Sequence, residues 1–286
     1  MKITIIDKKD AILKVDNKTL KVDTQKIPLR LVDTLIIASS NDINTKELIK
    51  ITKEQISIII LSHFAKDSAI ITSTTSKNAE VKLAQYNAQK NSISIAKYFI
   101  SQKLISHVSH LKLHHIEINL DKTLQKIEDT DDLQTLLGIE GSFSRNYFSH
   151  YFKLFPKGMH SGKRTKNPPL DPVNALMSFL YMLFYNLISI KLISFGFEPS
   201  IGFLHKPFRS HNALASDFME LIRSEINEFV FLSFKNKIIS KDDFTKRDGV
   251  YLKYEGRKNL WSSLKSFIDI LNPKLDANIA NLRSML

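Results

Sequence analysis

The sequence contains no cysteine among its 286 residues. That absence excludes disulfide bonds and thiolate-bound zinc together, and it is typical of the reducing cytoplasm, where we expect this protein to act. A glycine-rich phosphate-binding loop and a serine nucleophile elbow are also missing, so neither P-loop nor serine-hydrolase chemistry is indicated. The N-terminal stretch 1–10 is too short, and too charged after its apolar run, to be a signal peptide.

Acidic residues are scarce relative to basic ones. There are 41 Lys and Arg residues against 29 Asp and Glu residues, which gives a formal net charge of +12. Such an excess is typical of proteins that bind a polyanion, so DNA or RNA is the expected class of partner. The alternative is a lysine-rich surface that serves solubility alone.

Charge is absent from residues 172–190, a stretch close to the length of a membrane-spanning helix. Its polar side chains recur at helical spacing, however, and would form one stripe along the helix: Asn174, Ser178, Tyr181, Tyr185 and Ser189. A helix facing lipid would not gather its polar groups on one side without a partner helix. We therefore expect a buried central helix in a soluble protein, with no membrane partner.

Short runs of β-branched residues alternate with turn residues up to about residue 73, which predicts a small β-domain. The expected strands cover 3–6, 11–15, 19–22, 34–38, 56–61 and 69–72, and Thr45 is expected to cap a short helix over 45–52. The polar run 72–78 is the best boundary, because helical apolar spacing begins after it.

The predicted fold class is therefore α+β. We expect a small N-terminal β-sandwich-like domain over 1–76, a linker at 77–81 and a larger all-α catalytic domain over 82–286. Within the helical part, Asp171 followed by Pro172 is typical of a capped helix start.

A candidate metal-binding pattern lies between residues 200 and 223. A loop that carries His205 leads into a predicted helix with Asp217 and Glu220 three positions apart, and so on one face. Imidazole and carboxylates that face one space are the ligands of a hard or borderline divalent cation. Because the rest of the chain is basic, this pattern suggests chemistry on a phosphodiester. The alternative is a surface histidine before an ordinary amphipathic helix.

A third carboxylate, Glu140, lies between Gly138 and Gly141, where an aromatic helix over 140–155 is expected to begin. The flanking glycines would let another chain approach closely. A glutamate in a first helical turn is, however, commonly only a charge that balances the helix dipole. Other ionisable residues show no partnered metal spacing, and we expect the histidines of one predicted helix to lie on its surface: His107, His110, His114 and His115.

Two basic segments are candidates for nucleic-acid binding. A proline-stiffened loop holds Lys163, Arg164 and Lys166 just before the predicted central helix, where they could contact phosphates. The second segment, 235–258, interleaves basic and aromatic residues, as single-strand binding surfaces do. Solvated surface and a small aromatic core are the respective alternatives.

The order of these motifs resembles the CRISPR adaptation integrases of the Cas-one family. The resemblance rests on Gly-x-Glu-Gly at 138–141, Asn-Pro-Pro-x-Asp-Pro-Val-Asn-Ala-Leu-x-Ser-Phe-x-Tyr at 167–181, Gly-Phe-Leu-His at 202–205 and Ala-Leu-Ala-x-Asp-Phe-Met-Glu-Leu-Ile-Arg at 213–223. Asp243-Phe244 and Gly256-Arg257-Lys258 also resemble that family. Each motif is weak alone, but together they span essentially the whole chain, in order and at compatible spacing.

The resemblance implies a catalytic Mg²⁺ or Mn²⁺ held by Glu140, His205 and Glu220, with Asp217 as an accessory acid. Glu220 stands where many members have Asp, and it supplies the same hard oxygen. Two further arginines, Arg209 and Arg223, lie close to these residues in sequence, where they would contact DNA or balance the acidic charges.

The reaction that the resemblance implies is attack of the 3′-hydroxyl of a foreign DNA fragment on a phosphodiester of a CRISPR array. The implied partners are double-stranded DNA, a second copy of the chain bound partly through the β-domain, and the small Cas-two protein. Two alternatives remain open at this point: a metal-dependent nuclease that uses water as nucleophile on branched DNA, and a basic DNA-binding scaffold without catalysis.

Overall fold

The computed structural model describes residues 1–73, 78–207 and 211–286. The chain forms two compact units, each described here by itself: Met1–Ser76 with Arg257–Ile279, and Lys77–Gly256 with Ala280–Leu286. Strands dominate the first part of the chain and helices the rest, so the predicted α+β class is confirmed. The units differ from the predicted domain limits at one end, since most of the last helix groups with the N-terminal strands.

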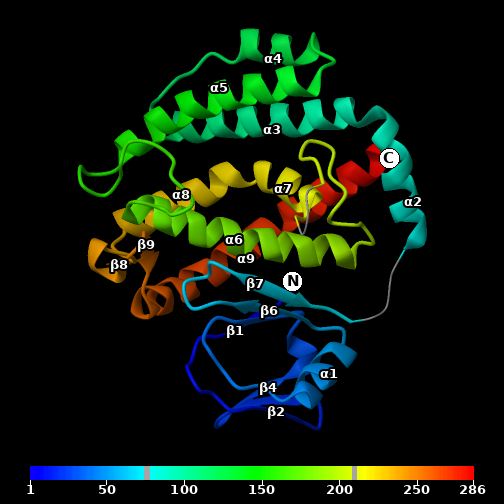
Figure 1. Ribbon diagram of the computed structural model, residues 1–286, viewed down its shortest axis with the longest axis vertical. Helices are drawn as coiled ribbons and strands as arrows, with labels where there is room; N and C mark the ends of the chain where they lie inside the picture. Colours follow the sequence, from blue (N-terminus) through cyan, green and yellow to red (C-terminus); the bar gives the residue numbers. More distant parts are fainter. Residues whose placement is uncertain (74–77, 208–210) are drawn as a thin grey trace. The chain divides into compact units, whose positions relative to one another are not determined.

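The N-terminal unit contains two sheets (Figure 1). The four-stranded sheet has the order β1-β5-β6-β7, in which β1, β5 and β6 run parallel and β7 pairs antiparallel with β6. The second sheet is the antiparallel meander β2-β3-β4. The elements are β1 (Ile3–Ile6), β2 (Leu13–Asp16), β3 (Thr19–Val22), β4 (Gln25–Pro28), β5 (Thr34–Ile37), α1 (Thr45–Lys53), β6 (Ser57–Leu61) and β7 (Ser68–Ile71).

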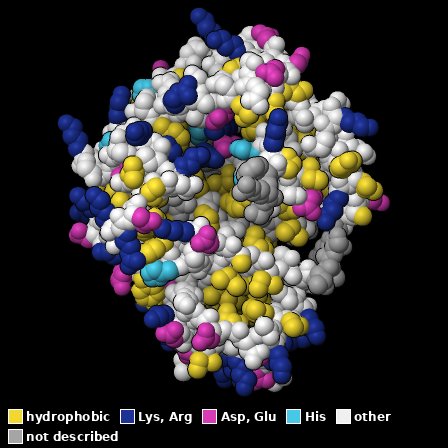
Figure 2. Space-filling model, in the orientation of Figure 1, with side chains coloured by type: hydrophobic (Ala, Val, Ile, Leu, Met, Phe, Trp, Pro, Cys, Tyr) yellow, Lys and Arg dark blue, Asp and Glu magenta, His cyan; other side chains and the backbone are white. Residues whose placement is uncertain are grey.

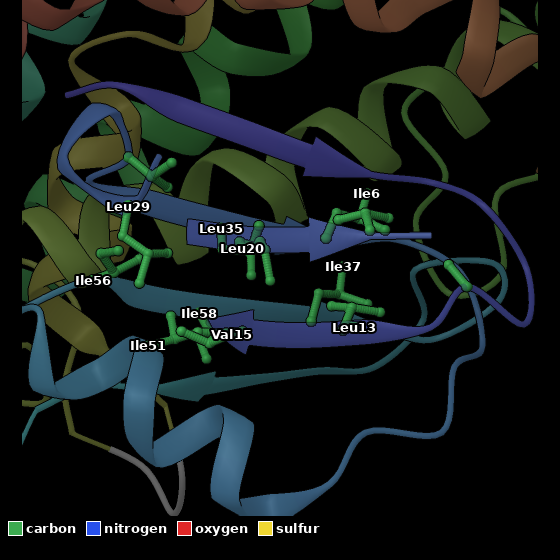
Figure 3. Packing of buried hydrophobic residues seen from close by; sticks show 13 residues of the cluster. Ile6, Leu13, Val15, Leu20, Leu29, Leu35, Ile37, Ile51, Ile56 and Ile58 are labelled. Atoms are coloured by element: carbon green, nitrogen blue, oxygen red, sulfur yellow. The ribbon is translucent and has the colours of Figure 1, made fainter. Parts of the chain in front are cut away.

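Side chains from both sheets and from α1 meet in one apolar core (Figure 3). In β2, Leu13 and Val15 point inward while the residues between and after them are exposed, which is the expected alternation for a sheet with one covered face. Helix α1 is capped by Asn44, whose side chain accepts a hydrogen bond from the Lys46 amide at 2.9 Å. The prediction of Thr45 as the cap was therefore wrong by one residue.

A buried ion pair joins the two sequence segments of the N-terminal unit. Arg257 donates from Nε and Nη2 to the two carboxylate oxygens of Asp7, each at 3.1 Å, and from Nη1 to the His63 carbonyl at 2.6 Å. Trp261 Nε1 donates a further hydrogen bond to Asp7 at 2.8 Å. Because both charged side chains are almost fully buried, this bidentate pairing explains why residues beyond 256 belong to this unit.

The helical unit is built around α6 (Pro172–Ser194), which begins as predicted. Asp171 caps it by accepting a hydrogen bond from the Asn174 amide at 2.8 Å, and Pro172 occupies the first turn. Helix α6 is long and apolar enough to cross a membrane by composition, but 72% of its apolar window is buried inside the protein. That burial is expected for the core helix of a soluble protein.

The other helices of this unit pack around α6 or against one another, with α3 alongside α5, α7 and α8 (Figure 1). A two-stranded antiparallel hairpin, β8-β9, was not predicted. The elements are α2 (Ala79–Asn87), α3 (Ser92–Leu113), α4 (Asp121–Glu128), α5 (Leu133–Tyr151), α7 (Ala213–Glu220), α8 (Arg223–Lys235), β8 (Phe244–Lys246) and β9 (Val250–Leu252), followed by α9 (Tyr254–Met285), which the two units share.

Candidate metal centre

Two carboxylates from different helices share one cation in the helical unit. Glu140 on α5 accepts a hydrogen bond from the ammonium group of Lys103 on α3, and the same nitrogen lies 2.5 Å from Glu220 Oε2 at the end of α7. Lys103 and Glu220 are only 5% and 4% exposed. Water screens such charges poorly, so each carboxylate feels the shared cation strongly.

Arg223, the first residue of α8, is the second cation of this cluster. Its Nη2 lies 2.5 Å from Glu220 Oε1, and its guanidinium carbon stands 4.7 Å from the centre of the Tyr181 ring. Burial alone would raise the pKa of Glu220, but the charges of Arg223 and Lys103 outweigh it and lower that pKa below its usual range. Glu220 is therefore held ionised.

Asp217 does not face the same cation. Its fully buried carboxylate accepts three backbone hydrogen bonds, from the amides of Phe203, Leu204 and His205, at 2.7, 3.1 and 2.9 Å. It also contacts Nδ1 of His205 at 2.7 Å. Asp217 thus fixes both the loop and the ring of His205, and leaves Nε2 of that ring as the nitrogen available to a ligand.

Glu140 lies in the middle of α5 rather than in its first turn, because the helix begins at Leu133 and is capped by Asp132. The expected stabilisation of Glu140 by the helix dipole is therefore wrong. Its carboxylate is instead held by Lys103 and by Ser144, whose hydroxyl donates at 2.6 Å. A Cβ atom built on Gly138 or Gly141 meets nothing within 4 Å, so both glycines border open space.

The structure thus relates the predicted ligands to one another in different ways. Glu140 and Glu220 meet on Lys103, whereas His205 is linked to Glu220 by electrostatic attraction, which helps to lower the pKa of Glu220 after the larger effects of burial and the two cations. Among the described residues, a different group of three side chains has ligand atoms that all lie within 4.8 Å of one another: His110, His114 and Glu228.

The histidines of α3 are not the surface residues that we expected. His107 and His110 are buried, and His107 stacks on Tyr147 at 3.8 Å with neither ring nitrogen hydrogen-bonded. Burial lowers the pKa of His107 well below its ordinary value, and the nearby charge of Lys103 adds to the effect. His110 and His114 contact Glu228. Only His115 has the exposed position predicted for all four.

The polar stripe of α6 holds the loops that flank the cluster. Asn174 and Ser178 accept hydrogen bonds from Arg164, each at 3.0 Å, and the Tyr181 hydroxyl donates to Asn227 at 2.5 Å. Toward the other end of α6, Tyr185 and Ser189 accept from the backbone and the side chain of Asn212 at 2.6 and 3.0 Å. The stripe therefore forms hydrogen bonds within the protein along its length, with Asn174 and Ser189 buried and the other three side chains half-buried.

The predicted DNA-binding cations occupy unlike surroundings. Lys163 and Lys166 are exposed, whereas Arg164 is held by α6 and by Tyr181, 5.3 Å from its guanidinium carbon. Arg223 is engaged with Glu220. Arg209 lies outside the described residues. Lys and Arg side chains are spread over the visible face of the helical unit in Figure 2.

Lys103 is the functional residue that sequence reasoning missed. A signal was present, because Phe99, Lys103 and His107 follow one another at intervals of four residues in a predicted helix and must share a face. Phe99 and Leu104 are fully buried, which places the lysine among core positions. A charge on an apolar face calls for a buried partner of opposite sign.

Comparison with known proteins identifies the family. Residues 4–266 match the family model described as CRISPR associated protein Cas1. The chain is 31% identical to the CRISPR-associated endonuclease Cas1 1 of Thermodesulfovibrio yellowstonii, over 94% of this chain and 92% of the relative. It is 30% identical to the CRISPR-associated endonuclease Cas1 3 of Thermus thermophilus, over 85% of this chain and 75% of that one.

The fold agrees with solved structures. A Cas1 protein from Thermotoga maritima superposes with a TM-score of 0.91 at 20% identity, covering 99% of this chain and 96% of the other. A casposase bound to its integration product gives a TM-score of 0.82 at 23% identity, covering 95% and 83% of the two chains.

Fold and relatives together place the chain among the CRISPR-associated endonucleases of the Cas1 type. The chain belongs to the Cas1 (Cas-one) family. The predicted family is confirmed, and the named relatives support the predicted enzymatic class, an endonuclease.

Proposed function

We propose that Glu140, Glu220 and His205 hold the catalytic divalent cation, Mg²⁺ or Mn²⁺, of this integrase. The observation that carries the proposal is that a buried carboxylate, Glu220, and a half-buried one, Glu140, already converge on one positive charge, the ammonium group of Lys103. Glu220 Oε2 is buried and lacks a hydrogen bond of good geometry, so it has a lone pair to offer. Hard carboxylate oxygens and one imidazole suit these two metals.

The bound cation would polarise the scissile phosphate and activate the attacking hydroxyl. Asp217 holds His205 in the orientation in which Nε2 faces away from the carboxylate. Arg223 and Lys103 keep Glu220 ionised, and both cations would stabilise the negative charge that develops on the oxygens of a phosphate bound at this metal. Displacement of Lys103 from the carboxylates would free it for such a contact.

The proposed substrates are a DNA fragment with a free 3′-hydroxyl and the repeat end of a CRISPR array. Exposed Lys163 and Lys166 are the proposed phosphate contacts. We further propose Cas2 as a partner, a homodimer formed partly through the β-unit and a cytoplasmic location. The fold shared with the Cas1 of a Cas6-RT-Cas1–Cas2 complex, with a TM-score of 0.82 at 23% identity over 99% of this chain and 34% of that one, supports the Cas2 assignment.

The deciding experiment mixes a labelled 3′-hydroxyl duplex with a supercoiled repeat plasmid and titrates Mg²⁺ or Mn²⁺. Joined product is expected. Nicks without joining would favour the nuclease that uses water, and binding without either product would favour a scaffold. Glu140→Gln should abolish joining because a neutral amide is a poor metal ligand, whereas exposed Glu117→Gln should join normally. Equal joining by both variants would refute the site assignment.

A further inference from the structure

A second group of potential metal ligands lies on the same long helix as Lys103. His110 lies in the last turn of α3 and His114, four residues on, caps its C-terminus, and both contact the same carboxylate. Glu228 on α8 meets both, with its Oε2 at 3.0 Å from His110 Nε2 and 2.7 Å from His114 Nε2. Three ligand atoms from two helices thus surround one point.

The surroundings hold these ligands in place as they do in protein metal sites. The other nitrogen of His110, Nδ1, lies 2.8 Å from the hydroxyl of buried Tyr147, which itself accepts a hydrogen bond from Asn227 at 2.9 Å. The ring of His114 packs edge-on against Phe231, with ring centres 4.7 Å apart. An outer partner on the second ring nitrogen is the usual device that orients a metal-bound histidine.

We propose that His110, His114 and Glu228 form a separate metal site for a borderline cation of the zinc type. Two imidazoles and one carboxylate suit zinc, whereas magnesium prefers an all-oxygen set. Ligand atoms around tetrahedral zinc stand roughly 3.3 Å apart, given bonds of about 2.0–2.1 Å. Glu228 Oε2 lies 3.0 and 2.7 Å from the two ring nitrogens, which are within 4.8 Å of each other, so its carboxylate, on a side chain that is 24% exposed, would move slightly away from the rings on metal binding.

The protons of the two histidines can be assigned both without and with a bound metal ion. Without metal, the hydrogens on Nε2 of His110 and His114 point at Glu228 and explain the short contacts. With metal, Nε2 of each ring offers its lone pair, and the single proton of neutral His110 resides on Nδ1, where the Tyr147 oxygen accepts it. No group outside the cluster has to change its charge.

Such an ion would join α3 to α8. Both helices also carry cations that bind Glu220, namely Lys103 and Arg223. The zinc-type site would thus stabilise the framework of the carboxylate cluster without taking part in the reaction. Its existence does not depend on the proposed catalytic metal.

The test titrates zinc into chelator-stripped, full-length protein in excess Mg²⁺ and measures bound zinc by mass spectrometry. One zinc per chain is expected in the wild type. His114→Ala and Glu228→Gln should weaken zinc binding by at least about 100-fold, because changes in outer partners alone cost roughly 10–100-fold. Neighbouring, exposed His115→Ala is the matched control and should bind like the wild type. His114 and Glu228 are both partly exposed, so these variants should fold, which circular dichroism checks.

Cobalt provides an independent readout, since a tetrahedral Co²⁺ complex absorbs visible light and the hexahydrated ion scarcely does. Glu140→Gln should keep both the zinc and the cobalt signal, which separates this site from the catalytic one. Wild-type protein that binds no zinc in Mg²⁺ would show that the cluster is only a hydrogen-bonded ion pair. Zinc bound equally well by His114→Ala, Glu228→Gln and the wild type would place the ion elsewhere. Either result overturns the proposal.

Discussion

The buried charged side chains of the two units differ in how completely they are hydrogen-bonded. In the β-unit, Asp7 and Arg257 form a closed bidentate pair that Trp261 completes. In the helical unit, Glu220 faces two cations, yet neither its Oε2, 2.5 Å from Lys103 Nζ, nor the Nε of Arg223 forms a hydrogen bond of good geometry. In the first arrangement the polar atoms of the pair are hydrogen-bonded, whereas in the second some polar atoms form no hydrogen bond of good geometry.

The difference indicates which buried charges are structural and which are chemical. A fully satisfied pair has nothing left to offer a substrate, and its value lies in fixing the packing. A cluster of two cations and two carboxylates in which some polar atoms lack a hydrogen bond of good geometry is suited to exchange one partner for another. Perturbed carboxylates in such a setting are candidates for function.

The sharpest way to break this comparison is to neutralise Glu220. Glu220→Gln keeps the shape but removes a metal ligand, so DNA joining should fall by about 1,000-fold, as expected when several kcal/mol of charge stabilisation is lost. Gel assays in Mg²⁺ measure the joining. Glu220→Ala should also unfold more easily, because it strands Lys103 and Arg223 without a carboxylate. Normal joining by the Gln variant would move the metal role to another residue.

Removing one partner of the Asp7–Arg257 pair should instead lower the free energy of unfolding. Asp7→Ala leaves Arg257 buried without its carboxylate, and we expect a loss of about 3–5 kcal/mol in the free energy of unfolding. Urea denaturation followed by circular dichroism measures it. Exposed Asp42→Ala is the control and should change stability by less than about 0.5 kcal/mol, because its backbone is not in the left-handed region. Similar losses in both variants would mean that the pair is not special.

Because of His107, the free energy of unfolding should depend on pH. The pKa of this buried ring is lowered in the folded protein, so below pH 6.5, its ordinary pKa, the unfolded chain takes up a proton that the folded chain refuses. Stability is therefore complete above that pH, and falls as the pH drops, by up to about 1.4 kcal/mol per unit. His107→Phe keeps the stacking on Tyr147 and should flatten the profile measured by denaturation between pH 4.5 and 7.5. Parallel profiles would contradict a buried, neutral His107.

The smallest effect concerns exposed charge. The double variant Lys163→Ala, Lys166→Ala should weaken binding to unrelated DNA duplexes by similar factors. It should also reduce the slope of log affinity against log salt by about two, because each lysine that no longer neutralises a phosphate lowers that slope by about one. Fluorescence anisotropy at several salt concentrations measures the slope. An unchanged slope would make the loop a solvated connection and favour the basic segment 235–258.

Local sequence patterns predicted most of the β-unit, because strands such as 34–37 and 57–61 are runs of β-branched residues. Strand β4 escaped notice, since Gln25–Pro28 is half-exposed and has little apolar alternation. The hairpin β8-β9 was missed because its strands are three residues long and lie within a basic segment.

At the site, single residues were easier to predict than their partners. Glu140, His205 and Glu220 were predicted as ligands from motif order, and Asp217 as an accessory acid. In the structure Asp217 holds the His205 loop. The spacing of Phe99, Lys103 and His107 could have marked Lys103 as a buried charge, but not its partners, because which charges meet is decided by the packing of α3 against α5, α7 and α8. Glycines at 138 and 141 suggested a helix start, yet α5 runs through both.

Lys103 also bears on the order in which the enzyme matures. Lys103 and Arg223 already pair with Glu140 and Glu220, so these carboxylates need no metal ion to balance their charge while the chain folds. Under the proposed function, loading with magnesium would then be a late and reversible step that follows the free concentration of the ion in the cell. Chelation should silence the enzyme but leave it intact, unlike small zinc domains that unfold when stripped.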